Sequence, residues 1–320
     1  MLAALAEPRD VAALIDAVPA LPPDAVRFCL GLLAQAGIIA TAEDGRLEEE
    51  LDATLRQWQF HDLLFQARAR LGRHDDAFGG TFRFRGGIPP LPAVKTPADA
   101  ELVSLPRFDL GRCAARDPSL TEVIEARRSL RHQGARPITR DQLAEFLFRV
   151  ARVDRVLPPD PERQRWYEIS TRPYPSGGAT YDLELYLVVD RCEGIAAGVY
   201  HYDAWAHGLR RVAEPGHLTD LLIDGARLAT KAPARPQVLI VLTSRFQRVS
   251  WKYETIAYAT TLKNVGVLFE LMYLTATAMG LAPCALGGGD SDLFATITGT
   301  DYLTEASVGE FMLGTRDTAE

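Results

Sequence analysis

The chain has 320 residues, with 35 Lys and Arg against 42 Asp and Glu, so its formal net charge is −7. This acidic balance argues against a nucleic-acid-binding protein, because such proteins usually present a basic domain or stripe. A hydrophobic content of 47% with 24% charged residues is typical of a globular chain, and no apolar run approaches the roughly 18 residues of a membrane span.

The cysteines and the N-terminus indicate the compartment. Cys29, Cys113, Cys192 and Cys284 lie far apart and share no metal-ligand spacing with histidine, so we expect no metal site. The N-terminal MLAALAEPRD has no basic region ahead of its short apolar run, so a signal peptide is not expected. These features favour free thiols in a cytoplasmic protein.

Residues 1–85 are predicted to form a separate helical module. An amphipathic helix begins at Pro23 and ends at Gly37, Ile38 and Ile39 are predicted to be a short strand, and residues 43–45 a turn. Helix, helix and small hairpin is the order of a winged helix. A basic recognition helix is missing, which favours a peptide-docking or purely structural role over DNA binding.

A stretch rich in Pro and Gly separates this module from the rest of the chain. A helical pattern over 47–71 precedes it, and five prolines and two glycines lie between residues 86 and 106. Residues 86–117 are therefore expected to be a linker or a wrapping arm rather than a packed element. This places the second domain at 118–320.

The second domain has an α+β pattern. Ser119 with Glu122 and Thr139 with Gln142 are capping boxes, which predict two helix starts. Alternating or continuous apolar runs predict strands over 183–189, 199–202, 238–243 and 309–313.

A long apolar helix is predicted from about Tyr253 to Met279. Between Val265 and Met279 the only charged residue is Glu270, so the helix is apolar on all sides and has to be enclosed by protein. One domain can surround one central helix, and a homodimer interface would supply the missing cover.

A basic segment follows the first capped helix. Arg127, Arg128 and Arg131, with the hydroxyl of Ser129, suit a phosphate or another anion, because guanidinium groups offer paired donors. A solvated basic turn that complements the helix dipole explains the same residues equally well.

Two glycine-containing loops and one dipeptide are further candidates. Glycines at 177–178 and 287–289 permit the backbone to approach a flat ligand, although ordinary loops have the same composition. Neither a P-loop nor a dinucleotide-binding fingerprint is present. Lys252–Tyr253 offers an acid/base pair, but a single dipeptide of this kind is common.

Taken in their order, these segments resemble the SagB/McbC-type flavin-dependent azoline dehydrogenases, a branch of the nitroreductase superfamily. The N-terminal RQWQFHDLLFQARARLGR is more loosely similar to an extension of some members. The matching stretches of the second domain are ARRSLR at 126–131, RPYPSGGATYDLELYLVV at 172–189, GVYHYDAWAHGLRRV at 198–212, the stretch 251–290 with WKYETIAYATTLKN and LGGGD, and VGEFMLGTR at 308–316.

The resemblance implies an FMN enzyme on a nitroreductase-like α+β fold, usually a homodimer with the flavin at the subunit interface. It implies a catalytic pair, Lys252 and Tyr253, although some members have Arg-Tyr there. It assigns the FMN phosphate and ribityl chain to Arg127, Arg128, Ser129, Arg131, Gly314 and Arg316. It places along the isoalloxazine ring Pro175, Ser176, Gly177, Gly178 and Ala179, with Leu286, Gly287 and Gly288 on another side.

The implied reaction is the oxidation of thiazoline or oxazoline rings to thiazoles or oxazoles in peptide natural product biosynthesis. The substrate would be an azoline-containing peptide, either a ribosomal precursor or a carrier-protein-bound nonribosomal intermediate, with a cyclase or synthetase as a partner. Two alternatives stay open: an NAD(P)H-dependent nitro- or quinone reductase, and a non-catalytic subunit that binds flavin or presents substrate to a cyclase.

The implied reaction requires Lys252 and Tyr253 to reach the same substrate, and this limits where the pair can lie. Neighbouring side chains on a regular helix point about 100° apart, because the helix has 3.6 residues per turn. Lys252 and Tyr253 can therefore act on one substrate only if they lie at or before the start of the long helix. We predict that they do.

Overall fold

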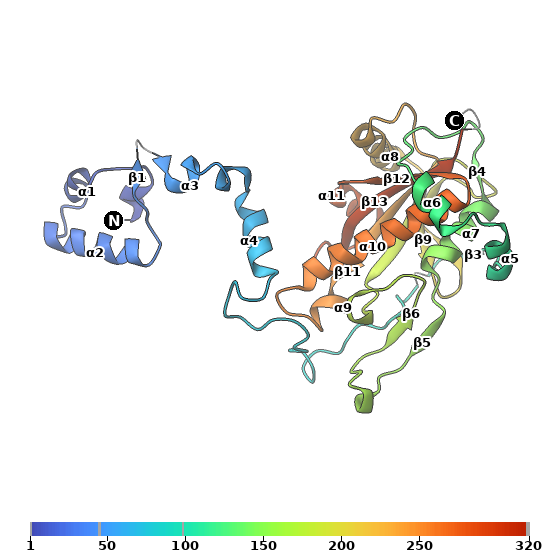
Figure 1. The fold of residues 1–320 in the computed structure, drawn as a ribbon, viewed down its shortest axis with the longest axis horizontal. Coiled ribbons are helices and arrows are strands. Elements are labelled where there is room, and N and C mark those ends of the chain that lie inside the picture. Colours follow the sequence, from blue (N-terminus) through green and yellow to red (C-terminus); the bar gives the residue numbers. More distant parts are fainter. Residues whose placement is uncertain (1, 44–45, 98, 318–320) are drawn as a thin grey trace. The chain divides into compact units, whose positions relative to one another are not determined.

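The computed structural model describes residues 2–43, 46–97 and 99–317, which fall into two compact units, Met1–His74 and Asp75–Glu320 (Figure 1). The division lies before residue 85, where the sequence places the end of the N-terminal module. The cause is that the stretch after His74 pairs with the second unit: Gly79 exchanges two backbone hydrogen bonds with Glu254.

The first unit consists of short helices and one hairpin. Its elements are η1 (Leu2–Leu5), α1 (Val11–Ala17), α2 (Pro23–Gln35), β1 (Ala42–Glu43), β2 (Arg46–Leu47), α3 (Glu48–Leu51), η2 (Leu55–Gln57) and α4 (Phe60–Arg68). The helix–helix–hairpin order expected of a winged-helix-like module is present. Most of the turn expected at 43–45 lies outside the described residues.

Two predictions for the first unit are wrong in detail. Ile38 and Ile39 form a bend, not a strand, because both of their backbone N–H groups donate to Leu33 O at the end of α2. The continuous helix expected over 47–71 is broken into three pieces. At the first break the Asp52 carboxylate accepts hydrogen bonds from Thr54 N and Leu55 N, which favours a turn over continued helix.

A seven-stranded antiparallel sheet forms the centre of the second unit, in the order β12-β13-β11-β7-β9-β10-β3. The four predicted strands are confirmed as parts of β7, β9, β11 and β13. The strands are β3 (Leu102–Ser104), β7 (Leu183–Val189), β9 (Gly198–Asp203), β10 (Gly208–Ala213), β11 (Val238–Arg245), β12 (Leu281–Leu286) and β13 (Glu305–Thr315). Two small sheets pair β4 (Ile138–Thr139) with β8 (Cys192–Glu193) and β5 (Arg155–Leu157) with β6 (Ile169–Thr171).

Helices cover both faces of the large sheet. Alternating residues of β7 sort onto the two faces: Leu187 packs with α7 and α10, whereas Tyr186 packs with α8 and α11. Both predicted capping boxes are present, at the starts of α6 and α7. The helices are α5 (Leu110–Arg116), α6 (Leu120–Ala126), α7 (Arg140–Ala151), η3 (Pro161–Arg163), η4 (Gly177–Ala179), α8 (His217–Thr230), α9 (Phe246–Ser250), α10 (Ala257–Ala278) and α11 (Ser291–Thr298).

The long helix α10 is not enclosed within one chain. Leu268 and Met272 are fully buried against the sheet, but Leu262 and Val267 on the other side are each 39% exposed. The helix begins at Ala257 rather than near Tyr253. The single chain covers only the side of the helix that faces the sheet, so cover of the other side by a second copy stays a prediction.

The Pro-rich stretch 86–117 belongs to the second unit and packs within it. Ala93 is fully buried, β3 forms the edge of the large sheet, and α5 contributes the buried Cys113. All four cysteines are free. In the described part of the chain, no helix is both long and apolar enough to cross a membrane, and no three His, Cys, Asp or Glu side chains gather as metal ligands would.

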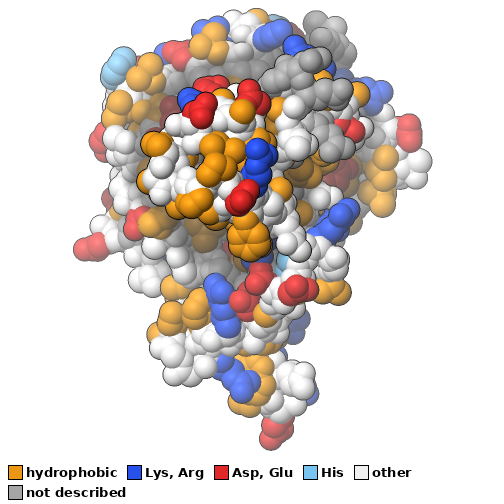
Figure 2. All heavy atoms as spheres, turned by 90° about the vertical axis from the view of Figure 1, so that its left-hand side faces the viewer, with side chains coloured by type: hydrophobic (Ala, Val, Ile, Leu, Met, Phe, Trp, Pro, Cys, Tyr) orange, Lys and Arg blue, Asp and Glu red, His pale blue; other side chains and the backbone are white. Residues whose placement is uncertain are grey.

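Large apolar side chains are exposed on the first unit. Phe28 on α2 and Phe60 on α4 are 68% and 72% exposed. Figure 2 shows hydrophobic side chains at the surface among charged side chains of both signs.

Candidate functional site

Lys252 and Tyr253 lie in the turn between α9 and α10, ahead of the start of α10 at Ala257. The prediction about their position is therefore confirmed. Lys252 Nζ donates a hydrogen bond to Gly178 O at 3.1 Å. A Cβ atom on Gly178 would clash with both Lys252 Nζ and Tyr253 OH, so the two functional groups converge on one point.

The glycine loop at 177–178 is fixed against α10. Gly177 N donates to Asn264 Oδ1 at 2.9 Å, and Asn264 Nδ2 donates to the buried carboxylate of Asp182 at 2.7 Å. A Cβ on Gly177 would clash with Thr260, and Gly178 has a φ of +62°, a region that favours glycine. Both glycines are thus required by close approach and backbone conformation.

Three aromatic rings surround the amine of Lys252. Its Nζ lies 5.6 Å from the ring centroids of Phe82 and Tyr167 and 5.2 Å from that of Tyr253. Tyr167 OH also donates to Gly178 O, at 2.7 Å. The carbonyl of Gly178 therefore accepts hydrogen bonds from both Tyr167 and Lys252.

This enclosure shifts the pKa of the amine and the pKa values of the phenols in opposite directions. Burial lowers the pKa of Lys252, because water no longer stabilises the ammonium form. Burial raises the pKa of Tyr253 and raises that of Tyr167 to about 12. Lys252 can thus act as a base, while the two tyrosines stay neutral donors.

The predicted arginine segment lies beside the ends of β12 and β13. Leu130 N donates to Pro283 O, and Gly134 N donates to Thr315 O. These bonds bring the segment alongside Gly314 and Arg316, as the resemblance implies.

The side chains of this segment have different surroundings. Arg128 Nη1 donates to the carbonyls of Glu125 and Arg127 and so caps α6, as the helix-dipole explanation requires. Arg127 stacks on Tyr273 at 5.3 Å, and the Ser129 hydroxyl is 2.8 Å from Tyr273 OH. Over the described residues, none of the guanidiniums of Arg127, Arg128, Arg131 and Arg316 forms an ion pair with a carboxylate.

The second glycine loop lines an open cleft of about 490 Å³ along the exposed side of α10. Leu286, Gly287 and Gly288 form one wall, and Leu262, Gly266 and Phe269 form the other. The floor requires Gly309, because a Cβ there would come within 2.8 Å of Phe269. The cleft is open to solvent, and polar and apolar atoms both line it.

The predicted site residues form three groups along α10 rather than one cluster. Lys252, Tyr253 and the loop 175–179 lie near Thr260, whereas the arginine segment lies near Tyr273. The two positions are 13 residues apart (273 − 260), which is roughly 20 Å along a helix. The cleft at Leu286–Gly288 lies between them along the helix.

One ionisable residue near the cleft has no counterpart among the predictions. Glu310 on β13 is 2% exposed, its Oε1 has no hydrogen-bond partner among the described residues, and Gly289 packs directly on its carboxylate. Burial, with a smaller contribution from Asp290, raises the pKa of Glu310 to about 7. Glu310 is therefore poised to exchange a proton near neutral pH.

Sequence reasoning missed several residues that shape the site. Asn264 and Tyr273 are polar side chains within an otherwise apolar helix, and that contrast is a signal that could have identified them. Phe82, Tyr167 and Arg248 gave no comparable signal, because their role depends on contacts distant in sequence.

The donor set and the cleft fit a flavin mononucleotide. Guanidiniums without a carboxylate partner among the described residues, beside a serine hydroxyl, suit a phosphate, and an open cleft lined by glycines admits an aromatic ring. The amine of Lys252 and the phenol of Tyr253 are groups that can accept and donate a proton. The arrangement can therefore bind a flat anionic cofactor and move a proton.

Two family models match this chain. The Nitroreductase family model matches residues 124–315, and the Cyanobactin oxidase ThcOx model matches residues 1–75. The chain is 28% identical over 170 residues to the Methanocaldococcus jannaschii protein MJ1384, described as a nitroreductase; this covers 52% of the chain and 78% of that protein.

A second relative is the microcin B17-processing protein McbC of Escherichia coli. It is 30% identical over 158 residues, which is 46% of this chain and about half (53%) of McbC. These matches confirm the resemblance to the SagB/McbC-type branch.

A solved structure has the same fold. A nitroreductase-type protein from Anabaena variabilis superposes with a TM-score of 0.55 at 19% identity, over 78% of this chain and 45% of that chain. The nitroreductase-like α+β fold is thereby confirmed. Because the family model spans more than half of the residues, the chain belongs to the nitroreductase family of oxidoreductases.

Proposed function

We propose that the protein is an FMN-dependent azoline dehydrogenase, which oxidises thiazoline or oxazoline rings of a peptide to thiazoles or oxazoles. The observation that carries the proposal is the convergence of Lys252 Nζ and Tyr253 OH at Gly178. It is supported by the match of the first 75 residues to a cyanobactin oxidase model and by the likeness to McbC, a microcin-processing protein.

The residues of the pair have separate roles. The Cα proton of the azoline is acidified by the ring imine and the neighbouring carbonyl, so a single well-placed base suffices to remove it. Lys252 takes this proton, because burial favours its neutral amine. Tyr253 keeps its proton and orients the ring by donating a hydrogen bond.

Residues of this chain would hold FMN in two places. Arg127, Ser129, Arg131 and Arg316, with Arg128 through its remaining guanidinium nitrogens and Gly314 for close approach, would bind the phosphate. The loops Pro175–Ala179 and Leu286–Gly288 would lie along the ring. When bound, FMN supplies the electron acceptor for the hydride that leaves Cβ of the azoline.

A homodimer would complete the site. The phosphate group of residues and the Lys–Tyr group lie at different positions along α10, and the exposed side of this helix carries Leu262 and Val267. A second copy on this side would cover the helix and bring its own glycine loop to the cofactor. Mixing an inactive Lys252→Met protein with an inactive Arg131→Ala/Arg316→Ala protein tests this: recovered turnover supports shared sites, and none after subunit exchange contradicts them.

The first unit would dock the peptide. Its helix–helix–hairpin order and exposed Phe28 and Phe60 support peptide binding over a purely structural role. Deleting residues 1–74 should abolish turnover of a full-length precursor and spare a short azoline. Equal losses on both substrates would instead favour a stabilising role. The four free thiols support action in the cytoplasm, beside a cyclase or synthetase that makes the azoline.

Anaerobic reduction of the bound flavin tests the reaction itself. We expect a thiazoline peptide to bleach the visible absorption of the bound flavin within a single turnover. Rapid bleaching by NADPH with none by the peptide would instead identify a nitro- or quinone reductase, which the likeness to MJ1384 favours as a second function. A colourless protein that cannot be loaded with FMN would indicate a non-catalytic subunit.

A further inference from the structure

A segment distant in sequence closes one side of the candidate site. The arm, defined here as residues 79–95, lies against the turn that carries Lys252 and Tyr253. Gly79 and Glu254 exchange backbone hydrogen bonds of 3.2 and 2.9 Å, and Phe82 N donates to Lys252 O at 3.2 Å. The arm therefore pairs with the backbone of the Lys–Tyr pair itself.

Side chains reinforce this pairing. Thr81 Oγ1 donates to one carboxylate oxygen of Glu254 at 3.0 Å, and Arg83 forms an ion pair with the other at 3.1 Å. Because Arg83 is half exposed, the ion pair adds little stability. Its effect is to hold the register of the arm beside Tyr253.

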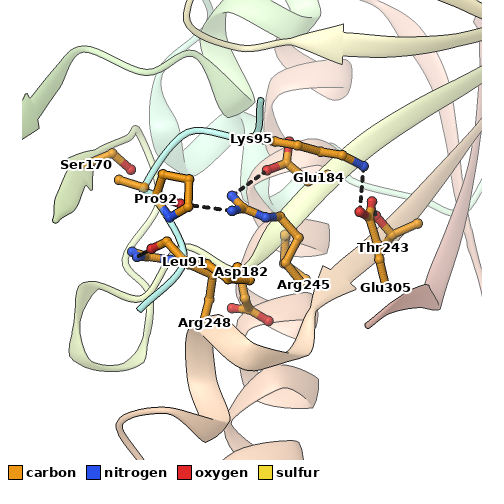
Figure 3. A network of polar contacts seen from close by, with 12 residues as sticks. Leu91, Pro92, Lys95, Ser170, Asp182, Glu184, Thr243, Arg245, Arg248 and Glu305 are labelled. Atoms are coloured by element: carbon orange, nitrogen blue, oxygen red, sulfur yellow. Dashed lines mark hydrogen bonds and ion pairs between the residues drawn. The ribbon is translucent and has the colours of Figure 1, made fainter. Parts of the chain in front are cut away.

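The second half of the arm is held by side chains of α9 and of the residues directly before and after this helix. Its three prolines have no N–H group, so its carbonyls are its main polar groups. Three side chains donate to them: Trp251 Nε1 to Ile88 O at 2.7 Å, Arg248 Nη1 to Leu91 O at 2.7 Å, and Arg245 Nη2 to Pro92 O at 2.9 Å. Figure 3 shows the last of these bonds and the ion pair between Lys95 and Glu305 at the end of the arm.

Arg248 connects the arm to the glycine loop. This guanidinium is 2% exposed and donates to three carbonyls, those of Leu91, of Thr180 just after the loop at 2.8 Å, and of Glu168 at 3.0 Å. The arm, the glycine loop and the Lys–Tyr turn are thus bound together by one buried side chain.

Phe82 is the residue of the arm that faces Lys252. Its backbone φ is +52°, which is unusual for a bulky side chain and costs energy unless the surroundings hold it. Trp251 holds the ring at 6.0 Å in an edge-to-face contact. The ring thereby forms one of the three walls around Lys252 Nζ.

We propose that Phe82 is a positioning residue for Lys252, and that the arm holds its ring so that water is excluded from one side of the amine. The inference rests on the proposed function, in which this amine removes a proton. The titratable and charged groups around the amine are Tyr253, Tyr167, Arg248 behind Tyr167, and the Arg83–Glu254 pair. Phe82 carries no charge, so it acts by excluding water and favours the neutral amine.

The test measures kcat/KM against pH for the full-length, FMN-loaded protein with an azoline peptide. Phe82→Asn keeps a residue that tolerates positive φ but admits water, and Phe82→Leu keeps an apolar wall without a π-system. We expect Phe82→Asn to move the rising limb of the kcat/KM profile to higher pH. Below the limb, kcat/KM should fall about threefold or more, and at high pH it should return to the wild-type value. Phe82→Leu should keep the wild-type pH profile of kcat/KM. Phe84→Leu, on the same arm, should keep this profile as well.

A second measurement needs no substrate. Competitive labelling with acetic anhydride, read by peptide mass spectrometry, reports the protonation of the Lys252 amine as a function of pH. In Phe82→Asn the labelling curve should move in the same direction as the activity limb. An unmoved curve, or one moved to lower pH because ring–cation attraction dominates, overturns the inference.

The two measurements separate the inference from the proposed function. If the wild-type protein turns over no azoline while the labelling curve still shifts in Phe82→Asn, the proposed function fails and the role of Phe82 stands. If turnover occurs and neither curve shifts, the role of Phe82 fails and the function stands. If Phe82→Asn does not fold, a labelling curve of Phe82→Leu displaced from wild type overturns the inference, and a coincident curve supports it.

Discussion

The amine of Lys252 donates a hydrogen bond of 3.1 Å to the carbonyl oxygen of Gly178, a residue with a φ of +62°. The same carbonyl accepts a bond from Tyr167. Gly178 thereby sets the position of the amine through its carbonyl and leaves space for the phenol of Tyr253 by lacking a side chain.

Gly178→Ala should abolish most activity while the protein stays folded. The new methyl group would clash with Lys252 and Tyr253, and the positive φ adds a cost of about 1–2 kcal/mol. We expect kcat/KM for an azoline peptide to fall by about 100-fold or more, as is common when catalytic groups are displaced by about 1 Å. Gly225→Ala, in α8 with open space around it, is the matched control and should retain wild-type activity.

Activity should rise with pH through a limb that lies below pH 10.5, the ordinary pKa of lysine. Burial lowers the pKa of Lys252, so the neutral amine that accepts the proton forms at a lower pH than in a free lysine. A pH profile of kcat/KM measures the limb. Lys252→Met should lose both the limb and most of the turnover, with the flavin still bound. A Met variant with the wild-type profile would show that another group is the base.

Tyr253→Phe should weaken turnover without moving this limb. Burial raises the pKa of Tyr253, so the phenol stays protonated at the pH values where the amine titrates. Removing one hydrogen-bond donor to a neutral acceptor typically costs about 0.5–1.5 kcal/mol, which corresponds to a loss of about 2- to 13-fold. Steady-state kinetics across pH would check this, and a displaced limb would make Tyr253 the group that titrates.

Removing the charge of Arg131 or Arg316 should weaken FMN binding. Both side chains are exposed and lack a carboxylate partner among the described residues, so each can give a charge-assisted hydrogen bond to a phosphate. We expect the Kd for FMN, measured by fluorescence quenching, to rise at least about tenfold for each alanine variant. Arg155→Ala is the control, because Arg155 is 71% exposed and pairs with Asp154. Unchanged affinity in both variants would place the phosphate elsewhere.

Stability should fall as pH rises from 4.5 to 7 because of Glu310. Its pKa is raised to about 7 in the folded protein, so the folded state binds more protons than the unfolded state within this window. The full difference corresponds to at most about 3 kcal/mol at 1.36 kcal/mol per pKa unit.

Chemical denaturation at pH 5 and pH 8 checks this prediction. We expect Glu310→Gln to gain stability relative to the wild type on going from pH 5 to pH 8, because it has no proton to lose. Glu101→Gln, at an exposed position, should follow the wild type at both pH values. An equal pH response of wild type and Glu310→Gln would mean that Glu310 does not titrate in this window.

The sequence was informative where local patterns decide the structure. The capping boxes at Ser119 and Thr139 predict helix starts because the cap and its partner are three residues apart. β7 could be predicted because a strand covered on both faces is mainly apolar, and Glu184 is the one charged residue in this run. The position of Lys252 ahead of α10 followed from a geometric requirement on neighbouring side chains.

The sequence was less informative where distant segments meet. The enclosure of Lys252 joins Phe82, Tyr167 and Tyr253, and no periodicity links residues separated by more than 80 positions. The sequence also does not show how much of α10 its own chain covers, since an apolar helix does not reveal whether its own chain or a second copy covers it. The family resemblance supplied the site residues that spacing could not.

The arm has a consequence for how such proteins exchange parts in evolution and in engineering. The chain divides after His74, yet Phe82, only eight residues further on, forms part of the wall around Lys252. The first unit can therefore be replaced up to His74 without changing the residues around Lys252. A chimera joined at residue 86, where the stretch rich in glycine and proline begins, would also replace Phe82. The activity lost through the changed surroundings of the amine would then be misattributed to the exchange of the first unit.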